Sequence, residues 1–298
     1  MGASALKTRA ATRDDLAAIA ELFGSVEEAV LGRPSRLDAD AVAGWMPRVP
    51  FATNTWLVEE GGSLIAGAFA HAPGERGVSA GAVRPSAQGR GMGRRLVELT
   101  EERLRDDGAA RVHAWTIAGD DGAQRLFDSL GYREARRFWE MAIELEDEIP
   151  EPAVAIETFC EKDAPGFHAA LEEAFEDHWE HHVETFEDWW SRQRAWPGYD
   201  PSLWFLIRQG PEIAAVVRSD PNRQAAGFVG ALGVRRPWRG RGYGRALLLQ
   251  TFGEFRRRGI SRASLGVDTA NPTGATRLYE SVGMKVEMES VLWQKLFR

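Results

Sequence analysis

Two short loops carry the residues whose types and spacing could do chemistry. They are Gln88–Gly93 and Arg239–Gly244, and both have the form (Gln/Arg)-Gly-Arg-Gly-x-Gly. Alternating glycines let a main chain approach an anion closely and adopt dihedral angles that other residues avoid. Each loop opens an amphipathic helix, whose free N–H groups and positive end attract negative charge. The pattern therefore predicts two cradles for a pyrophosphate group.

The second loop is also rich in arginine. Five arginines lie within eleven residues: Arg235, Arg236, Arg239, Arg241 and Arg245. Such a cluster favours a polyanionic ligand, and its alternatives are a solvated face or a nucleic-acid patch. The net charge of −7 argues against general affinity for nucleic acid or an anionic membrane. We expect a phosphate-bearing cofactor, and no nucleic-acid or membrane partner.

A second repeated motif follows each loop. Residues 123–132 (AQRLFDSLGY) match residues 275–284 (ATRLYESVGM), so both halves contain the same helix end. Two of the differences between the halves bear on chemistry: Tyr279 corresponds to Phe127, and Asn271 corresponds to Gly119. A phenyl ring has no proton to donate, so only the second half retains a hydroxyl there.

These motifs are placed by two similar sets of elements. The loops start roughly 150 residues apart, which is domain spacing and not that of a solenoid. The acidic, proline-containing segment 146–152 is the expected seam, giving domains 1–147 and 153–298. In the second half we predict strands at 153–159, 203–208, 212–219, 226–234, 262–268 and 285–297, and helices at 163–174, 177–194 and 272–282. In the first half we predict strands at 55–60, 63–71, 78–84 and 111–116, and a helix at 91–107. Leu248, Phe252 and Phe255 define one buried face of the helix after the second loop. The fold class is α/β, with a mixed sheet in each unit.

The two loops, each followed by its Leu-(Tyr/Phe)-x-x-x-Gly helix end, resemble the GNAT superfamily of acyl-coenzyme A-dependent N-acyltransferases, here in tandem. Other phosphate-binding motifs fit less well, because the chain has neither a P-loop Gly-Lys-(Ser/Thr) nor a G-x-G-x-x-G loop. The resemblance implies acetyl-CoA as cosubstrate and direct transfer of acetyl to a primary amine of a small molecule. It implies cofactor binding by Leu232, Gly233, Val234, Arg239, Gly240, Arg241, Gly242, Tyr243, Gly244, Arg245 and Asn271, and in the first unit by Val83, Gln88, Gly89, Arg90, Gly91, Met92, Gly93 and Arg94.

The same resemblance assigns roles in the reaction. Main-chain N–H groups at Leu232-Gly233-Val234 would hold the oxyanion. Tyr279 matches the tyrosine that donates to the departing thiolate. Because the first unit has Phe127 there, we expect it to bind coenzyme A weakly or structurally, with catalysis in the second unit. A non-catalytic acyl-CoA sensor that regulates a partner is the alternative.

The base that deprotonates the amine is not evident from the sequence. The tandem form is similar to the mycothiol synthase family, in which an acidic residue on the strand before the second loop is the base. Residues 225–234 contain no carboxylate, so that substrate is not implied here. Asp177, His178 and Asp268 are the candidate bases or ammonium anchors, while Trp179, Trp189 and Trp190 could line a pocket for a cation. A solvated helix face for the histidines and core packing for the tryptophans remain open, and no metal site is expected.

Composition bounds the remaining expectations. Apolar residues make up 44% and charged residues 27% of the 298 residues, as in a soluble globular protein. Residues 1–6 resemble neither a secretory leader nor a myristoylation signal, so a cytoplasmic location is the simplest expectation. Cys160 is the single cysteine, which excludes an internal disulfide, and we expect it to be packed. Two fused units could supply the contacts that other family members obtain by dimerising, so we expect a monomer.

Overall fold

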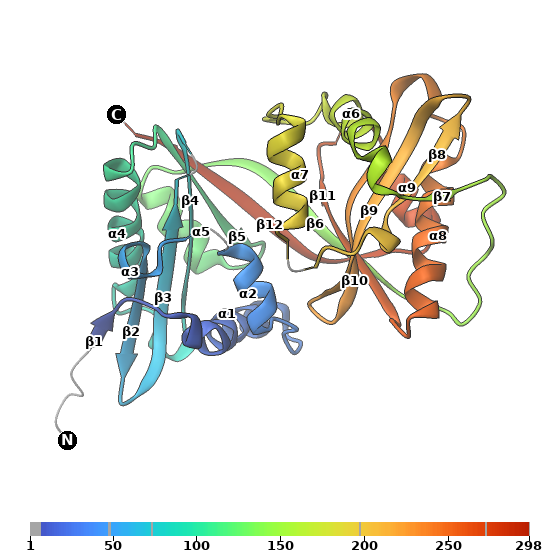
Figure 1. Ribbon diagram of the computed structural model, residues 1–298. Helices are drawn as coiled ribbons and strands as arrows, with labels where there is room; N and C mark the ends of the chain where they lie inside the picture. The colour runs from blue at the N-terminus through green and yellow to red at the C-terminus, as the bar shows by residue number, and fades with distance from the viewer. Residues whose placement is uncertain (1–6, 47–48, 73, 197, 272, 298) are drawn as a thin grey trace. The chain divides into compact units, whose positions relative to one another are not determined.

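The computed structural model describes residues 7–46, 49–72, 74–196, 198–271 and 273–297 (Figure 1). Contacts divide the chain into two compact units. Unit 1 comprises Met1–Phe138 and Met288–Arg298, and unit 2 comprises Trp139–Glu287. The expectation about residues 1–6 and the predicted helix start at Pro272 lie outside the described residues.

Unit 1 is a mixed sheet with helices on both faces. Its strands lie in the order β1-β2-β3-β4-β5-β12, with β4 and β5 parallel and the other pairs antiparallel. Gly67 of β3 faces Leu22 of α1, while Gly77 of β4 faces Leu104 of α4. The elements are β1 Lys7–Arg9, η1 Arg13–Asp15, α1 Leu16–Leu31, α2 Ala39–Trp45, α3 Phe51–Asn54, β2 Thr55–Glu60, β3 Ser63–His71, β4 Arg76–Val83, η2 Pro85–Ala87, α4 Met92–Asp106, β5 Arg111–Ile117, α5 Asp121–Ser129 and β6 Arg133–Glu144.

Unit 2 repeats this plan. Its strands lie in the order β7-β8-β9-β10-β11-β6, and β10 and β11 form the parallel pair. Gly233 of β10 packs against α6, while the side chain of the next residue, Val234, reaches α8, so the two helices cover opposite faces. The elements are β7 Glu157–Thr158, η3 Glu161–Asp163, α6 Ala164–Phe175, α7 Phe186–Arg194, η4 Pro201–Leu203, β8 Phe205–Gln209, β9 Glu212–Arg223, β10 Ala226–Val234, η5 Arg236–Trp238, α8 Tyr243–Arg257, β11 Arg262–Asp268, α9 Ala275–Ser281 and β12 Lys285–Leu296.

Two long strands pass from one unit into the other. β6 starts in unit 1 and ends in unit 2, whereas β12 starts in unit 2 and ends in unit 1 (Figure 1). Residues Ser290–Leu296 of β12 pair antiparallel with Arg111–Ile117 of β5. Each unit therefore completes its sheet with a strand that leads to or from the other half of the chain.

Most predicted elements are present, and the mixed sheets confirm the expected fold class. The predicted strands at 226–234 and 262–268 agree with β10 and β11, and Leu248, Phe252 and Phe255 are buried in unit 2. The predicted strand at 153–159 is wrong except for Glu157–Thr158, and the helix predicted from Asp177 begins only at Phe186.

The strand predicted at 212–219 is four residues longer in the structure, because β9 continues to Arg223. The hairpin turns at Gln224 and Ala225, whose φ angles of 55° and 56° reverse the chain over two residues.

Cys160 is exposed, contrary to the expected packing. It caps the short helix η3, where its main-chain N–H donates to Asp163 at 3.3 Å. Its position is set by this cap and not by burial of the thiol.

In the part of the chain that the structure describes, no helix has both the length and the apolar character needed to cross a bilayer.

Candidate functional site

The sheet of unit 2 splits between its two parallel strands. β10 pairs with β11 at Gly227↔Ala263 and Phe228↔Ser264, yet β10 continues to Val234 and β11 to Asp268. Because the strands diverge after Phe228, they open a wedge whose edges carry main-chain groups. In unit 1 the corresponding pairing of β4 with β5 runs from Arg76↔Arg111 to Ser79↔Ala114, and β4 continues to Val83.

Two of the three expected oxyanion donors face this wedge. The Arg235 N–H donates to the Ala214 carbonyl at 3.0 Å, so Arg235 and Ala214 form a hydrogen-bonded pair. Antiparallel pairs alternate, so Val234 and Leu232 turn their N–H groups away from β9 and towards the wedge. Gly233 uses its N–H in the ladder. Its role is packing, since a Cβ there would lie 2.9 Å from the Ala174 Cβ of α6.

The second glycine loop forms an open cradle at the start of α8. Gly240 and Gly242 have φ angles of 77° and 80°, a region that other residues rarely adopt. Gly242 is the N-cap of α8 and, as a glycine, makes no side-chain capping hydrogen bond to the first turn. By contrast, α7 is capped by the Thr185 hydroxyl. The first N–H groups of α8 are therefore available to an anion such as a diphosphate.

The expected cluster of five arginines is reduced to two exposed charges. Arg235 pairs with Glu173 at 2.5 Å and Glu212 at 3.0 Å, and Arg236 pairs with Asp177 at 2.5 Å. Arg239 instead holds the loop, donating from Nε to the Val234 carbonyl at 3.1 Å and from Nη2 to the Ala174 carbonyl at 3.2 Å. Arg241 and Arg245 are exposed and form no ion pair within the described residues. These two side chains remain free to contact phosphates.

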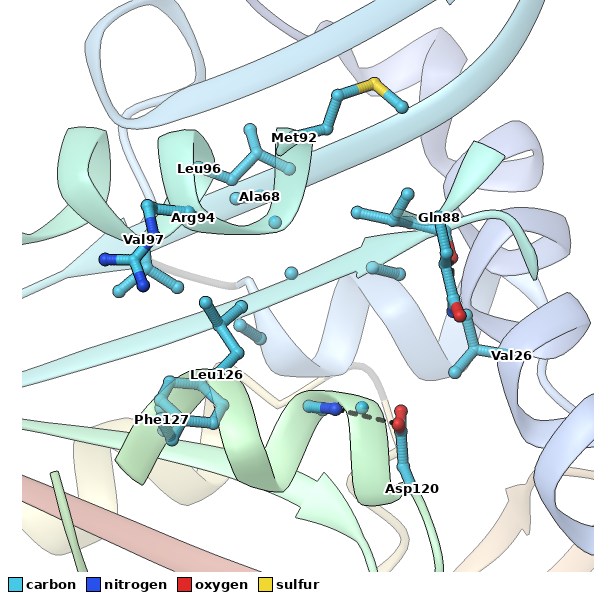
Figure 2. Close-up of a pocket in the computed structure, with 18 of the residues that line it drawn as sticks. Val26, Ala68, Gln88, Met92, Arg94, Leu96, Val97, Asp120, Leu126 and Phe127 are labelled. Atoms are coloured by element: carbon cyan, nitrogen blue, oxygen red, sulfur yellow. Dashed lines mark hydrogen bonds between the residues drawn. The ribbon is translucent and has the colours of Figure 1, made fainter. Parts of the chain in front are cut away.

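Unit 1 has the same cradle beside a cavity of about 560 Å³. Gly89 and Gly91 have φ angles of 76° and 80°, and Gln88 donates to the Val83 carbonyl at 3.2 Å, as Arg239 does to Val234. Figure 2 shows the cavity with Leu96 of α4 and Leu126 and Phe127 of α5 around it. Its lining also includes Gln88, Gly89, Gly91, Met92, Gly93 and Arg94.

The arginines of the first cradle are held by unit 1 itself. Arg90 forms a bidentate pair with Glu60, and Arg94 donates to the Ser129 hydroxyl at 2.8 Å. The first cradle therefore keeps its main-chain geometry, but the Arg90 guanidinium is already paired with the Glu60 carboxylate.

Tyr279 and Phe127 occupy equivalent helix ends in different surroundings. Tyr279 on α9 is 8% exposed, and burial raises its pKa to about 12. Such a hydroxyl is about 3.5 units less acidic than an ordinary thiol, or ~5 kcal/mol, which favours donating a hydrogen bond over surrendering the proton. Phe127 packs edge-on against Tyr132 and stacks on Trp293, with ring centroids 4.7 and 5.9 Å away. Its place in unit 1 is therefore an apolar one.

The three candidate bases lie near the open end of the wedge but differ in availability. Hydrogen bonding to Arg236 lowers the pKa of Asp177, which also lies 3.5 Å from Arg239. Asp268 accepts from the Ala270 N–H at 2.8 Å. His178 is partly buried against Phe175, and its Nε2 lies 3.5 Å from the amide nitrogen of Asn271. Burial lowers the His178 pKa, with Asp268 opposing that shift, so the ring is neutral at neutral pH.

The three tryptophans differ in their exposure to solvent. Trp189 is 4% exposed and lies among the rings of Phe167, His168 and Trp204, so a ligand in solution does not reach it. Trp190 is partly buried and stacks on Phe186. Trp179 is partly exposed in the segment between α6 and α7. Burial in the unit 2 core leaves Trp189 a packing residue.

No group of three or more His, Cys, Asp or Glu residues could hold a metal ion in the described ranges. The side chains of His178, His181 and His182 therefore do not combine with acidic neighbours into a recognisable metal site.

The face of the sheet opposite the cradle differs between the units. In unit 1 the α1 side is filled by an apolar cluster that includes Phe69, Ile19 and Met46, around a void of about 10 Å³. In unit 1, Phe69 lies three residues after Ala66, which pairs with Val83 at the end of β4. In unit 2, Arg218 lies three residues after Ala215, which pairs with Val234 at the end of β10. Arg218 is therefore the residue that corresponds to Phe69. Arg218 is not among the site residues predicted from the sequence, although an arginine directly after the apolar run 213–217 could have indicated it.

Comparisons with known proteins agree with this geometry. The Acetyltransferase (GNAT) family matches residues 26–132 and 165–284, once in each half. A mycothiol acetyltransferase from Thermobispora bispora is 33% identical over 224 residues, covering 72% of this chain and 74% of the relative. One from Thermobifida fusca is 29% identical over 265 residues, covering 80% of each.

Solved structures show the same tandem fold. A GCN5-related N-acetyltransferase from Sphaerobacter thermophilus is 32% identical, with a TM-score of 0.88 and coverage of 98% of this chain and 96% of that chain. A tandem GNAT protein from the clavulanic acid biosynthesis pathway has a TM-score of 0.72 at 15% identity, covering 98% of each chain.

A pair of matched glycine substitutions tests the cradles. Gly242→Val places a side chain in a left-handed conformation, at a cost of about 1–2 kcal/mol, and disturbs the amides that face the anion. We expect the Kd for acetyl-CoA at unit 2 to rise by at least about tenfold, or ~1.4 kcal/mol. Isothermal titration calorimetry measures this, and Gly91→Val is the matched control in unit 1.

The two substitutions are expected to affect separate binding events. A Gly242→Val protein that melts normally and binds acetyl-CoA as tightly as the parent would show that the second loop does not hold the cosubstrate.

Proposed function

The chain belongs to the acetyltransferase (GNAT) family, and on that premise we propose that unit 2 acetylates a primary amine of a small molecule with acetyl-CoA. The asymmetry between the units carries this proposal. Unit 2 has a hydroxyl at Tyr279 and a charged residue at Arg218, where unit 1 has Phe127 and Phe69. Apolar rings therefore occupy in unit 1 the two positions where unit 2 has polar groups.

The cosubstrate fits the residues that are present. The uncapped amides at the start of α8, with Arg241 and Arg245, would bind the diphosphate. The wedge between β10 and β11 would take the extended arm, because its edges offer main-chain donors and acceptors. The thioester carbonyl would then meet the Leu232 and Val234 N–H groups.

The reaction follows from these placements. The amine attacks the thioester carbonyl carbon, and the negative charge that develops on oxygen is held by main-chain N–H groups. The C–S bond breaks as the intermediate collapses, and Tyr279 donates a hydrogen bond to the departing thiolate. The amine proton passes to His178, directly or through water. His178 is the best of the three candidate bases because its ring is neutral, whereas Asp177 is held by two arginines.

The acceptor is proposed to be a small molecule because the similar enzymes from Thermobispora bispora and Thermobifida fusca are mycothiol acetyltransferases. Two features argue for a different amine. β10 carries no carboxylate, and Arg218 lies on the face opposite the cradle. The proposed function is therefore acetylation of a small-molecule amine, and the acceptor of those relatives is not carried over to this chain.

A second function is favoured for unit 1. Its cradle and its cavity of about 560 Å³ suit binding of an acyl-CoA, while Phe127 and Phe69 leave it without a thiolate partner or an open acceptor face. Unit 1 would then bind coenzyme A without catalysis, as a structural or sensing site.

Exchange of the two helix-end residues tests where catalysis occurs. Losing a hydrogen bond to a charged group costs about 1.5–3 kcal/mol, so Tyr279→Phe should lower kcat by roughly 10–150-fold with little change in acetyl-CoA affinity. Phe127→Tyr on that background should not restore turnover. A thiol-release assay with a panel of amines measures both.

Full turnover by the Tyr279→Phe protein would place the reaction elsewhere. Recovery by the added Phe127→Tyr change would move it to unit 1.

The pH dependence of kcat tests His178. The base must be unprotonated, and its pKa lies below the ordinary value of 6.5, so kcat at saturating substrates should be constant above neutrality and fall below pH 6.5. Tyr279, with a pKa of about 12, should add no alkaline decline below pH 10. His178→Gln should lower the plateau and remove the acid decline. An unchanged acid decline in that variant would exclude His178 as the base.

A further inference from the structure

Arg218 is a charged residue directly after the apolar run 213–217 of β9. The preceding residues, Val216 and Val217, are fully buried. The guanidinium lies against the main chain of Gly230 on β10, where a Cβ would stand 2.9 Å from Nη2 and 3.2 Å from Cζ. Glycine at position 230 therefore makes the room that this side chain occupies.

Arg218 has no partner among the described residues. It forms no hydrogen bond or ion pair there, although Asp220, Arg192 and Arg223 act on it electrostatically. Of these neighbours, Arg192 pairs with Glu184 at 2.5 Å, and Arg223 lies 4.0 Å from the Phe228 ring centroid. Asp220 is the acidic one of the three, and it interacts electrostatically with both Arg218 and Arg223 without a hydrogen bond to Arg218. Arg218 is partly exposed, and the surrounding protein desolvates the guanidinium and lowers its pKa. One carboxylate, Asp220, faces the two guanidinium groups of Arg218 and Arg223, so an excess of positive charge remains that an anionic ligand would balance.

The position of Arg218 relates it to the proposed reaction. Val216 and Gly233 are opposite residues on the α6 face, and Arg218, two residues after Val216, shares that face. Gly230 lies two residues beyond Phe228, where β10 and β11 separate. It is also about 7 Å along β10 from Leu232, at about 3.3 Å per residue. Arg218 therefore lies beside the inner end of the wedge, on the face away from α8.

A register shift between Val229 and Ala231 gives β10 an extra residue at Gly230. The matching pair in unit 1, β3 with β4, has an unbroken register, and Phe69 packs there against Phe23. At this strand pair, the described residues show a bulge and an arginine in unit 2, the unit with Tyr279, and an unbroken register and Phe69 in unit 1. Such bulges commonly redirect a side chain at a functional site.

We propose that Arg218 binds an acidic group, a carboxylate or a phosphate, on the amine that unit 2 acetylates. The inference rests on the proposed function and adds the class of acceptor. A guanidinium presents a planar fork that matches either oxyacid in a bidentate manner. The ligand would neutralise a charge that the protein leaves unpaired.

Matched acceptor pairs test the proposal with the full-length enzyme. β-Alanine and β-alaninamide differ by a carboxylate, while glucosamine 6-phosphate and glucosamine differ by a phosphate. The parent enzyme should prefer the acidic member of one pair by about tenfold or more in kcat/KM, and that pair identifies the oxyacid. Arg218→Met should remove the preference while leaving the KM for acetyl-CoA unchanged. Arg223→Met is the control: it removes a positive charge five residues further along β9 and should keep the preference for the acidic acceptor.

A second variant tests the same preference, and a second measurement tests the anion site even if the enzyme acetylates none of these amines. Gly230→Ala should displace the guanidinium without removing its charge and reduce the same preference. With coenzyme A present to fill the cradles, inorganic phosphate or malonate at constant ionic strength should raise the Tm of the parent and Arg223→Met proteins more than that of Arg218→Met.

The outcomes separate the two proposals. Failure to acetylate any amine counts against the proposed function, whereas the melting comparison still decides the anion site. Equal use of acidic and neutral acceptors by the parent would overturn the inference. So would an equal anion effect in Arg218→Met, or a fall of several degrees in its Tm without anions, which would make the arginine structural.

Discussion

The site depends on one constraint: main-chain N–H groups of β10 and of the start of α8 must be left without hydrogen-bond acceptors inside the protein. Buried amides are normally paired, yet β10 leaves β11 after Phe228, and α8 begins without a side-chain cap. The divergence of the strands places N–H donors on the β10 edge of the wedge, and the uncapped helix places N–H donors at its open end. Glycines make this possible, because positive φ at Gly240 and Gly242 brings the chain into α8 with its amides outward. Arg239 fixes the loop by bonding two carbonyls.

The chain carries this construction twice but completes it once. Both units have the left-handed glycines, an uncapped helix and a side chain bonded to the strand-end valine carbonyl. In unit 1 aromatic rings then fill the positions that chemistry would need, with Phe127 against Trp293 and Phe69 against Phe23. Apolar packing stabilises that unit while its cavity is kept. In unit 2 Arg218 has no hydrogen-bonding partner among the described residues and is only partly solvated, as is expected where a ligand binds.

Much of the framework could be predicted from the sequence because it depends on local patterns. Alternating or continuous apolar runs gave β10 and β11, and the glycine spacing located both cradles. Features that depend on distant residues could not be read in the same way. Arg235 and Arg236 look like phosphate ligands in the sequence, but carboxylates from α6, β9 and the segment after α6 pair with them. The aromatic spacing of Trp189 suits a pocket or a core, and only burial decides between them. Arg218 is visible in the sequence as a charge after an apolar run, but the bulge beside it depends on the register of two strands.

Hydrogen–deuterium exchange at the cradle amides tests the central claim most directly, because it reads the N–H groups themselves. On addition of saturating acetyl-CoA, the account predicts slower exchange for peptides that contain residues 240–246 and 232–234, with no comparable change in α7. Unaltered exchange at both segments, under conditions where acetyl-CoA is bound, would contradict it, because the cosubstrate would then be held by other parts of the protein.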